Sequence, residues 1–279
     1  MSDPLVSSAW LAERLGRADL QVLDGSWWMA PEGRSGLGEY LDAHIPGAVF
    51  FDIDAIADRT VDLPHMLPTP QAFAAAAGRL GLRREATIVT YDSHGIRAAA
   101  RVWWTLRVMG FQQVYVLDGG LPAWRAEGRA VETGEVVPPP SALAPRFDAA
   151  LVRDVNDVLG LMGSHAEQIV DARGGARFRG EVPEPRAGLR SGHMPGARNV
   201  AFDSLLTEGR MKPAASLAKI FADAGVDLDQ PIVTSCGSGV TASVVALALA
   251  RLGRDRAAVY DGSWTEWGGR ADTPVVAGP

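Results

Sequence analysis

The only cysteine in the chain opens a glycine-rich run whose residue types suit nucleophilic chemistry. The run reads Cys236-Gly237-Ser238-Gly239-Val240-Thr241. Backbone N–H groups of such a loop attract anions, and they favour the reactive thiolate over the thiol. The alternative is a buried cysteine that serves only as a small hydrophobic residue. The two glycines favour the nucleophile, because a core strand gains nothing from this loop chemistry.

The flanking residues indicate which elements hold this loop. An apolar stretch at 231–235 precedes the cysteine, and an apolar helical pattern at 241–252 follows it. This order predicts a buried strand that turns through the loop into a helix. Ligands of parallel α/β sheets bind beyond the carboxyl ends of the strands, and Cys236 would lie just past such an end.

Four blocks of the sequence recur in the same order in the two halves of the chain. His-Ile-Pro-Gly-Ala at 44–48 recurs as His-Met-Pro-Gly-Ala at 193–197. The other pairs are 22–24 with 169–171, 88–92 with 232–236, and 118–124 with 261–267. Such a long period indicates duplication of a whole domain rather than a short-repeat solenoid. In this register Asp92 corresponds to Cys236, and because a carboxylate cannot be a sulfur nucleophile, we expect chemistry only in the second half.

The duplication predicts an α/β fold with two tandem domains, each a parallel β-sheet flanked by helices. We expect a non-catalytic N-terminal domain over residues 1–135 and a catalytic C-terminal domain over 148–279. Between them, residues 136–147 form a proline-rich linker, because three consecutive prolines at 138–140 favour an extended chain.

Composition excludes several classes of function. The chain of 279 residues is 47% hydrophobic and 22% charged, as in globular proteins, and its net charge of −6 without a basic cluster argues against a nucleic-acid partner. No apolar stretch of about 18 residues and no signal-like N-terminus occur, so we expect no membrane association and a cytoplasmic location. A single thiol suits a reducing compartment. His65, His94 and His165 lack metal-ligand spacing, so we expect neither a metal nor another cofactor.

Several further motifs carry a resemblance to a known family. They are the two His-x-Pro-Gly-Ala blocks, Phe51-Asp52-Ile53-Asp54, His65-Met66-Leu67-Pro68, Arg101-Val102-Trp103-Trp104, Leu117-Asp118-Gly119-Gly120, Phe178-Arg179-Gly180 and Tyr260-Asp261-Gly262-Ser263-Trp264. Over nearly its whole length the chain resembles the tandem-domain rhodanese family, and within it the 3-mercaptopyruvate sulfurtransferases. The subtype follows from the cysteine loop, because thiosulfate-using rhodaneses usually carry basic residues where Gly237 and Ser238 stand.

The resemblance implies a double displacement at Cys236. The thiolate would take sulfur from 3-mercaptopyruvate, release pyruvate and keep the sulfur as a persulfide. A thiol acceptor, such as a thioredoxin-like dithiol, or cyanide would then remove the outer sulfur. The N–H groups of the loop residues Gly237, Ser238, Gly239, Val240 and Thr241 would cradle the sulfur and the approaching anion. Alternatively, Thr241 caps the following helix.

The resemblance also places carboxylate binding on Arg177 and Arg186, with Arg179 as a weaker third. A guanidinium suits a carboxylate because its planar fork binds both oxygens. The alternative is an ordinary exposed charged loop.

In the resembling enzymes, the serine at Ser238 pairs with a first-domain histidine, and that histidine pairs with an aspartate. The histidine falls on His44, but the aspartate falls near Ser35, where this chain has none. Asp42 or Glu39 could take its place, or Ser238 is a simple hydrogen-bond donor. Alternatively, His44 only closes a turn, as its counterpart in the second half would.

Three other functions compete with this interpretation. A thiosulfate:cyanide sulfurtransferase would want positive charge beside a dianion, which Gly237 and Ser238 do not supply. A phosphatase of the Cys-x5-Arg type would need an arginine where this chain has Ala242. A non-catalytic persulfide carrier or regulatory module fits the first half, with its Asp92, better than the whole chain.

Overall fold

The computed structural model describes residues 3–164 and 166–279. His165, for which we expect no metal-binding role, lies outside the described residues. The chain forms two compact units. The first unit comprises residues up to Asp58 together with Leu67–Asp148 and Glu208–Met211, and the second comprises Arg59–Met66, Ala149–Thr207 and Lys212–Pro279.

The first unit is built on a five-stranded sheet in the order β1-β5-β4-β2-β3. Its strands are β1 (Leu5–Val6), β2 (Leu20–Asp24), β3 (Val49–Phe50), β4 (Thr87–Tyr91) and β5 (Val114–Leu117). Every pairing is parallel. The central strand β4 is buried from Ile88 to Tyr91, as expected of a parallel strand that is covered on both faces.

The second unit repeats this architecture strand by strand. Its sheet has the order β6-β12-β11-β7-β8, again with parallel pairings. The strands are β6 (Val152–Arg153), β7 (Gln168–Asp171), β8 (Arg198–Asn199), β11 (Ile232–Ser235) and β12 (Ala258–Tyr260). Two further short strands, β9 (Leu206–Thr207) and β10 (Arg210–Met211), lie outside this sheet. The identical strand order confirms the predicted α/β fold with two copies of one domain.

Helices cover both faces of the first sheet. They are α1 (Ser8–Ala12), α2 (Gly36–Asp42), α3 (Pro70–Arg79), α4 (Ala98–Val108) and α5 (Gly120–Ala126), with a 3-10 turn η1 (Ala30–Glu32). One core cluster joins α1 and α5 to the side chains of Val22 and Val89. On the opposite face α4 contacts β4, where Thr90 Oγ1 donates a hydrogen bond to the Ala99 carbonyl at 3.0 Å.

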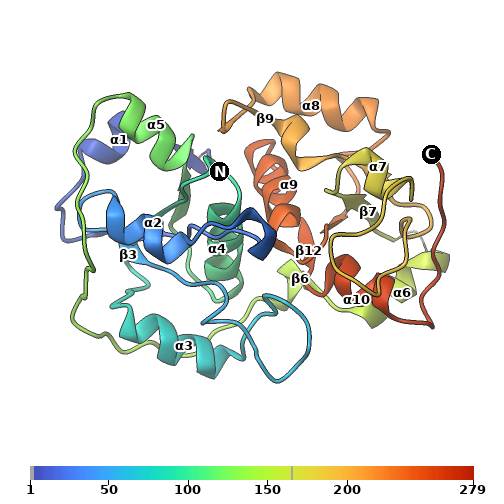
Figure 1. Ribbon diagram of the computed structural model, residues 1–279, viewed down its shortest axis with the longest axis horizontal. Coiled ribbons are helices and arrows are strands. Elements are labelled where there is room, and N and C mark those ends of the chain that lie inside the picture. Colours follow the sequence, from blue (N-terminus) through green and yellow to red (C-terminus); the bar gives the residue numbers. More distant parts are fainter. Residues whose placement is uncertain (1–2, 165) are drawn as a thin grey trace. The chain divides into compact units, whose positions relative to one another are not determined.

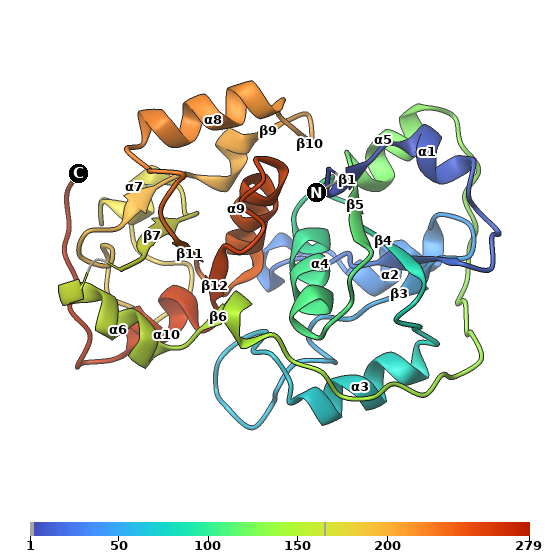
Figure 2. The same cartoon turned by 180° about the vertical axis from the view of Figure 1, so that it is seen from behind.

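The second sheet is covered in the same way. Its helices are α6 (Val155–Ser164), α7 (Gly175–Phe178), α8 (Ala214–Asp223), α9 (Val240–Arg251) and α10 (Ser263–Gly269), with 3-10 turns η2 (Ala149–Leu151) and η3 (Phe202–Leu205). Figure 2 shows α8 and α9 on one side of β11 and β12, and α6 and α10 on the other. Residues of α6 and α10 share a core cluster with Val233 of β11. Helix α9 is buried except at Thr241 and Arg251, so its N-terminus is held rigidly behind the cysteine.

The segment predicted as a linker has no helix or strand, but it is bonded to the first unit. It runs past α3 (Figure 1), where the Ser141 N–H donates to the Gly78 carbonyl at 2.8 Å. Nearby, Arg84 Nη2 donates to the Ala144 carbonyl at 2.6 Å. Proline thus keeps the chain extended, while hydrogen bonds fix it to a surface.

Candidate functional site

Cys236 lies directly after β11 and four residues before α9, as predicted. The strand is central in its sheet, so the cysteine stands at the carboxyl edge where parallel sheets bind ligands. Cys236 is a free thiol and only 2% exposed, and Ser238 is also buried. We call residues 236–241 the Cys236 loop.

The amide groups of the Cys236 loop fall into two sets. The N–H of Cys236 donates to Ser263 Oγ at 3.2 Å, and the N–H of Gly239 donates to the same oxygen at 3.1 Å. In contrast, the N–H groups of Gly237, Ser238, Val240 and Thr241 have no acceptor among the described residues. The predicted amide cradle therefore loses Gly239, whose amide is already bonded, and retains the other four donors.

Gly239 serves the loop through its conformation instead. It has φ +78°, a left-handed value that glycine adopts without strain, and it precedes the first residue of α9. No side chain caps this helix among the described residues, so the alternative role of Thr241 as a helix cap is wrong.

The carbonyl groups at the start of the loop point to α10. The Cys236 carbonyl accepts the N–H of Trp264 at 2.9 Å. The Gly237 carbonyl accepts both the N–H of Thr265 at 2.9 Å and its Oγ1–H at 2.7 Å. A carbonyl oxygen would repel a bound anion. Because these two carbonyl oxygens are bonded to α10, they do not face an anion in the loop.

Two of the three predicted arginines lie beside the Cys236 loop. A methyl group built on Gly237 would be 3.3 Å from Arg177 Nη2 and 3.7 Å from Arg186 Nη1. Arg177 comes from α7, and Arg186 from the segment that follows it. Residues of two separate segments thus bring two guanidinium groups to one glycine, which leaves room for them because it has no side chain.

Arg177 is oriented by a buried ion network. Its Nη2 donates to Glu184 Oε2 at 2.5 Å, and the other oxygen of Glu184 accepts from Arg173 Nη1 at 2.9 Å. Arg173 also donates to both oxygens of Asp171 and lies over the Trp264 ring, 4.0 Å from its centroid. Burial lowers the pKa of Arg173, but Asp171 and Glu184 more than offset this and raise it, so the guanidinium stays charged.

Arg179, the weaker candidate, has a different partner. Its Nε donates to Glu181 Oε1 at 2.6 Å, and both side chains are largely exposed. Its Nη1 lies near Gly175 rather than near the Cys236 loop. The geometry therefore favours the alternative of an exposed ion pair at this position.

His44 is completely buried in the first unit. Its Nδ1 lies 2.9 Å from the Tyr40 carbonyl, and its ring stacks on Tyr40. His193 is held in the same way in the second unit, by the carbonyl and ring of Phe178. This shared arrangement favours the turn-closing role for His44.

The predicted relay carboxylates have other partners. Ser35 caps α2 by accepting the N–H of Gly38 at 3.0 Å. Glu39 accepts hydrogen bonds from Arg34, Trp28 and Ser93. No hydrogen bond among the described residues joins His44 to Glu39 or Asp42.

Sequence reasoning missed His65, which belongs to the same compact unit as Cys236. It is buried and has a left-handed φ of 62°, a conformation that costs energy in a residue other than glycine. Its segment, Arg59–Met66, comes from the first half of the sequence but joins the second unit. In the sequence, His65 belongs to the motif at 65–68 that contributes to the family resemblance, but the motif alone assigns it no function.

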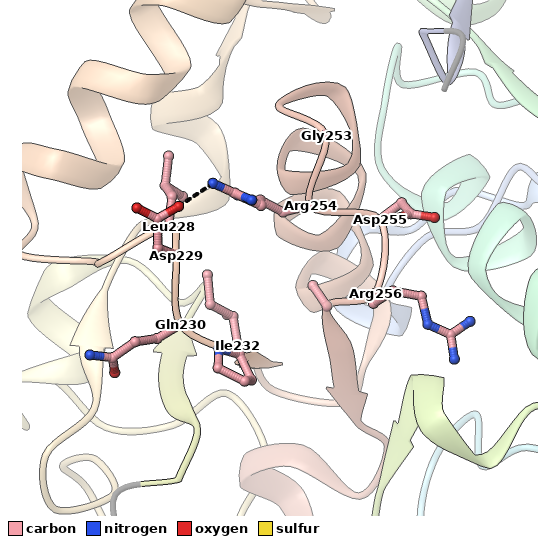
Figure 3. Close-up of a pocket in the computed structure, with 10 residues that line it drawn as sticks. Leu228, Asp229, Gln230, Ile232, Gly253, Arg254, Asp255 and Arg256 are labelled. Carbon is pink, nitrogen blue, oxygen red and sulfur yellow. Dashed lines mark hydrogen bonds and ion pairs between the residues drawn. The ribbon is translucent and has the colours of Figure 1, made fainter.

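A cavity of about 300 Å³ lies elsewhere in the second unit. It is lined by residues at the starts of β11 and β12, among them Pro231, Ile232 and Ala257 (Figure 3). An ion pair between Arg254 and Asp229 crosses it. This is the amino edge of the sheet, opposite to Cys236, and the residues that line the cavity include no thiol.

The described residues contain no group of three or more His, Cys, Asp or Glu side chains placed to hold a metal ion. None of their helices has the length and apolar character needed to cross a membrane.

Known proteins match this chain over nearly its full length. The model of the rhodanese-like domain matches twice, at residues 7–127 and 154–270. The 3-mercaptopyruvate sulfurtransferase of Escherichia coli K12 is 46% identical over 273 residues, covering 97% of this chain and 96% of that protein. The mitochondrial thiosulfate/3-mercaptopyruvate sulfurtransferase 1 of Arabidopsis thaliana is 44% identical, covering 98% of this chain and 78% of that protein.

A solved structure agrees with these matches. The crystal structure of SseA from Escherichia coli, a 3-mercaptopyruvate sulfotransferase with the rhodanese fold, has a TM-score of 0.86 at 43% identity. The alignment covers 93% of this chain and 98% of that one. The chain therefore belongs to the rhodanese family, and it carries the rhodanese-like domain in two tandem copies.

Proposed function

We propose that this protein is a sulfurtransferase that moves sulfur from 3-mercaptopyruvate through a persulfide on Cys236 to a thiol acceptor or cyanide. One observation carries the proposal. The only thiol of the chain lies in a loop with four unengaged amide donors, and two guanidinium groups flank its second residue. Amides suit a thiolate or persulfide, and guanidinium groups suit the carboxylate of an α-keto acid.

The first half-reaction breaks the carbon–sulfur bond of the donor. The Cys236 thiolate attacks the donor sulfur and forms a sulfur–sulfur bond. The electron pair of the broken bond leaves with pyruvate as its enolate, which then takes a proton. The amides of Gly237 and Ser238 stabilise the sulfur anion, while Arg177 and Arg186 hold the carboxylate.

The second half-reaction regenerates the enzyme. A thiolate acceptor, for example of a thioredoxin-like dithiol, or cyanide attacks the outer sulfur of the persulfide. The sulfur–sulfur bond breaks, and its electron pair returns to Cys236 as the thiolate. This chemistry needs neither metal nor cofactor, and it suits a reducing compartment such as the cytoplasm.

We infer that His65, rather than His44, is the first-half histidine that handles a proton with Ser238. His65 belongs to the unit that contains Cys236, whereas His44 lies in the core of the other unit. The variant His65→Asn should lower kcat, and His44→Asn should mainly lower the melting temperature. Equal losses of kcat without any loss of stability in His44→Asn would contradict this assignment.

The decisive experiment is intact-mass measurement after incubation with 3-mercaptopyruvate. We expect the wild type to gain one sulfur atom, removable by cyanide or a dithiol, and Cys236→Ser to gain none. Ser243→Ala, in the following helix, is the matched control for loss of a small polar side chain. A sulfur gain that persists in Cys236→Ser would show that the nucleophile is misassigned.

The competing function is that of a thiosulfate:cyanide sulfurtransferase. Thiosulfate is part of the name of the Arabidopsis relative. Here glycine and serine follow the cysteine, so the loop itself adds no positive charge for a dianion to that of Arg177 and Arg186. The ratio of kcat/KM for 3-mercaptopyruvate to that for thiosulfate tests this choice, and a ratio below one would reverse it.

A further inference from the structure

Ser263 adopts a backbone conformation that its residue type disfavours. Its φ is +49°, in the left-handed region where non-glycine residues are uncommon and strained. The corresponding residue of the first unit is Gly120, which has a similar φ of +53° without strain. The second unit therefore keeps a side chain at a position where glycine would be easier to accommodate.

The hydroxyl of Ser263 is buried, and all its hydrogen-bonding capacity is used. It accepts the N–H of Cys236 at 3.2 Å and that of Gly239 at 3.1 Å. Its own hydrogen goes to the Tyr260 carbonyl at 2.9 Å. A hydroxyl has one donor and two acceptor positions, so these three bonds fix it completely and tie the first and fourth residues of the loop to one oxygen.

In the first unit, the corresponding loop is held by a side chain that belongs to the loop itself. There the Asp92 carboxylate accepts the N–H groups of His94 and Gly95, both at 2.9 Å, and those of Arg97 and Ala99, both at 2.8 Å. A methyl group on Gly120 would lie 2.4 Å from the Asp92 carbonyl oxygen. The loop of the first unit thus closes where the second unit holds the Ser263 side chain.

Thr265 of α10 also bonds the loop through groups that its counterpart in the first unit does not have. Thr265 donates twice to the Gly237 carbonyl, through its N–H at 2.9 Å and its Oγ1–H at 2.7 Å. Its counterpart in the repeat is Pro122, which has neither an N–H nor a hydroxyl. Two residues of α10 therefore hold the Cys236 loop through groups that the first unit lacks.

We propose that Ser263, assisted by Thr265, is a positioning residue that holds the Cys236 loop from behind and aims its unengaged amides at the cysteine sulfur. In the first unit an internal carboxylate orders the loop and fills it. In the second unit an external hydroxyl orders the loop and leaves its interior open to a sulfur atom and a donor. The proposal rests on the proposed function only in taking Cys236 Sγ as the reacting atom.

The test compares Ser263→Gly and Ser263→Ala with the wild type by iodoacetamide alkylation of Cys236. Glycine relieves the φ strain, so Ser263→Gly should fold with an unchanged melting temperature. At pH 7 we expect alkylation of both variants to be roughly tenfold slower than that of the wild type, which is about the effect of losing one ordered hydrogen bond. At pH 10 we expect the alkylation rates to be unchanged. With 3-mercaptopyruvate, kcat should fall while KM stays constant, because Arg177 and Arg186 are untouched.

Two controls separate positioning from general damage. Ser26→Ala removes a buried hydroxyl that accepts the Ser93 N–H at 2.9 Å in the first unit, and it should leave alkylation unchanged. Thr265→Val removes the side-chain bond to Gly237 while keeping the branched shape, and it should slow alkylation at pH 7 by a smaller factor.

The proposal fails if Ser263→Gly and Ser263→Ala are alkylated at wild-type rates at pH 7, whatever their melting temperatures. It also fails if the rates at pH 7 and pH 10 fall together, since that indicates reduced access rather than lost amide alignment. Alkylation requires no sulfur donor. A wild type that shows the expected alkylation pattern but no sulfur transfer would thus refute the proposed function alone.

Discussion

The two halves of this molecule build the same loop and use it in opposite ways. After β4, the Asp92 carboxylate accepts four backbone N–H groups of its own loop. After β11, Cys236 stands at the same position, and four N–H groups of its loop have no acceptor among the described residues. We therefore propose that the fold provides an anion site twice, and that one side chain decides whether the chain itself occupies it.

A second difference lies at the end of the neighbouring strand. Asp24 and Asp171 end β2 and β7, and both are buried. In the second unit Arg173 pairs with the aspartate through both carboxylate oxygens, whereas the first unit has Ser26 at that position. The unit with the cysteine therefore has a buried cation beside its site, from which the network to Arg177 extends.

The largest expected effect on sulfur transfer comes from placing the aspartate of the first loop at the cysteine position of the second. In Cys236→Asp the new carboxylate should fill the amide cradle, as Asp92 does, so sulfur transfer should fall by at least about a thousandfold. Cys236→Ser should be equally inactive but less stable to urea than Cys236→Asp, because serine does not satisfy the amides. Equal stability of the two variants would contradict the idea that the second loop has lost an internal anion.

Substitutions of the arginines test whether the Cys236 loop binds the anion of a substrate, where the first loop binds its own Asp92. Arg177→Ala should raise KM for 3-mercaptopyruvate by roughly a hundredfold, since it removes one of the two guanidinium groups proposed to bind the carboxylate. Arg179→Ala is the matched control, and it should change KM by less than about threefold, because this side chain pairs with exposed Glu181. Similar effects of the two substitutions would overturn the assignment.

Removing the charge of the internal anion should destabilise the first unit. Asp92→Asn keeps the shape of the side chain but replaces one acceptor oxygen by a donor NH2 group that faces backbone N–H groups. We expect the free energy of unfolding to fall by about 2 kcal/mol, as measured in urea. Alkylation of Cys236 should keep its wild-type rate, and a slowed rate would mean that the two loops are not independent.

Asp24 makes a pH-dependent contribution to stability. Burial raises its pKa to about 6, although hydrogen bonds from Ser26 partly oppose this shift. The folded state therefore binds a proton more tightly than the unfolded chain, where the pKa is about 3.9. The stabilisation is fully present below about pH 4 and is lost as pH rises through 6.

The substitution Asp24→Asn replaces the carboxyl by a group that stays neutral. Relative to the wild type, its free energy of unfolding should improve between pH 5 and pH 8 by on the order of 1 kcal/mol. Asp171→Asn is the matched control: it removes one of the two carboxylate partners of Arg173, and it should destabilise at both pH values. A difference for Asp24→Asn that does not change with pH would rule out titration of this group.

Local sequence signals predicted much of the molecule. The recurring blocks predicted the duplication, and each half has the same strand order because apolar strands and their turns lie at equivalent places. The strand, loop and helix around Cys236 followed from contiguous residues. The proximity of Arg177 and Arg186 to Gly237 matches the interpretation taken from the family resemblance.

Contacts between distant segments could not be predicted in this way. Ser263 lies 27 residues after Cys236, and its role depends on the packing of α10 against β11. The repeat held one signal for it, since Asp-Gly-Gly at 118–120 becomes Asp-Gly-Ser at 261–263. The role of His44 stays a prediction: in both units this motif places a buried histidine beside a carbonyl and an aromatic ring, an arrangement that favours the turn-closing alternative.

The buried chain of charges from Arg173 through Glu184 to Arg177 has a consequence for selectivity. An arginine on a free surface loses about 2 kcal/mol of rotamer entropy when it is immobilised by a ligand. Arg177 is already held by Glu184, whose side chain is only 2% exposed, so much of that loss occurs during folding. A preorganised guanidinium beside Gly237 would fix where the carboxylate of a donor binds relative to Cys236. It should discriminate among sulfur donors by the distance between their carboxylate and their sulfur.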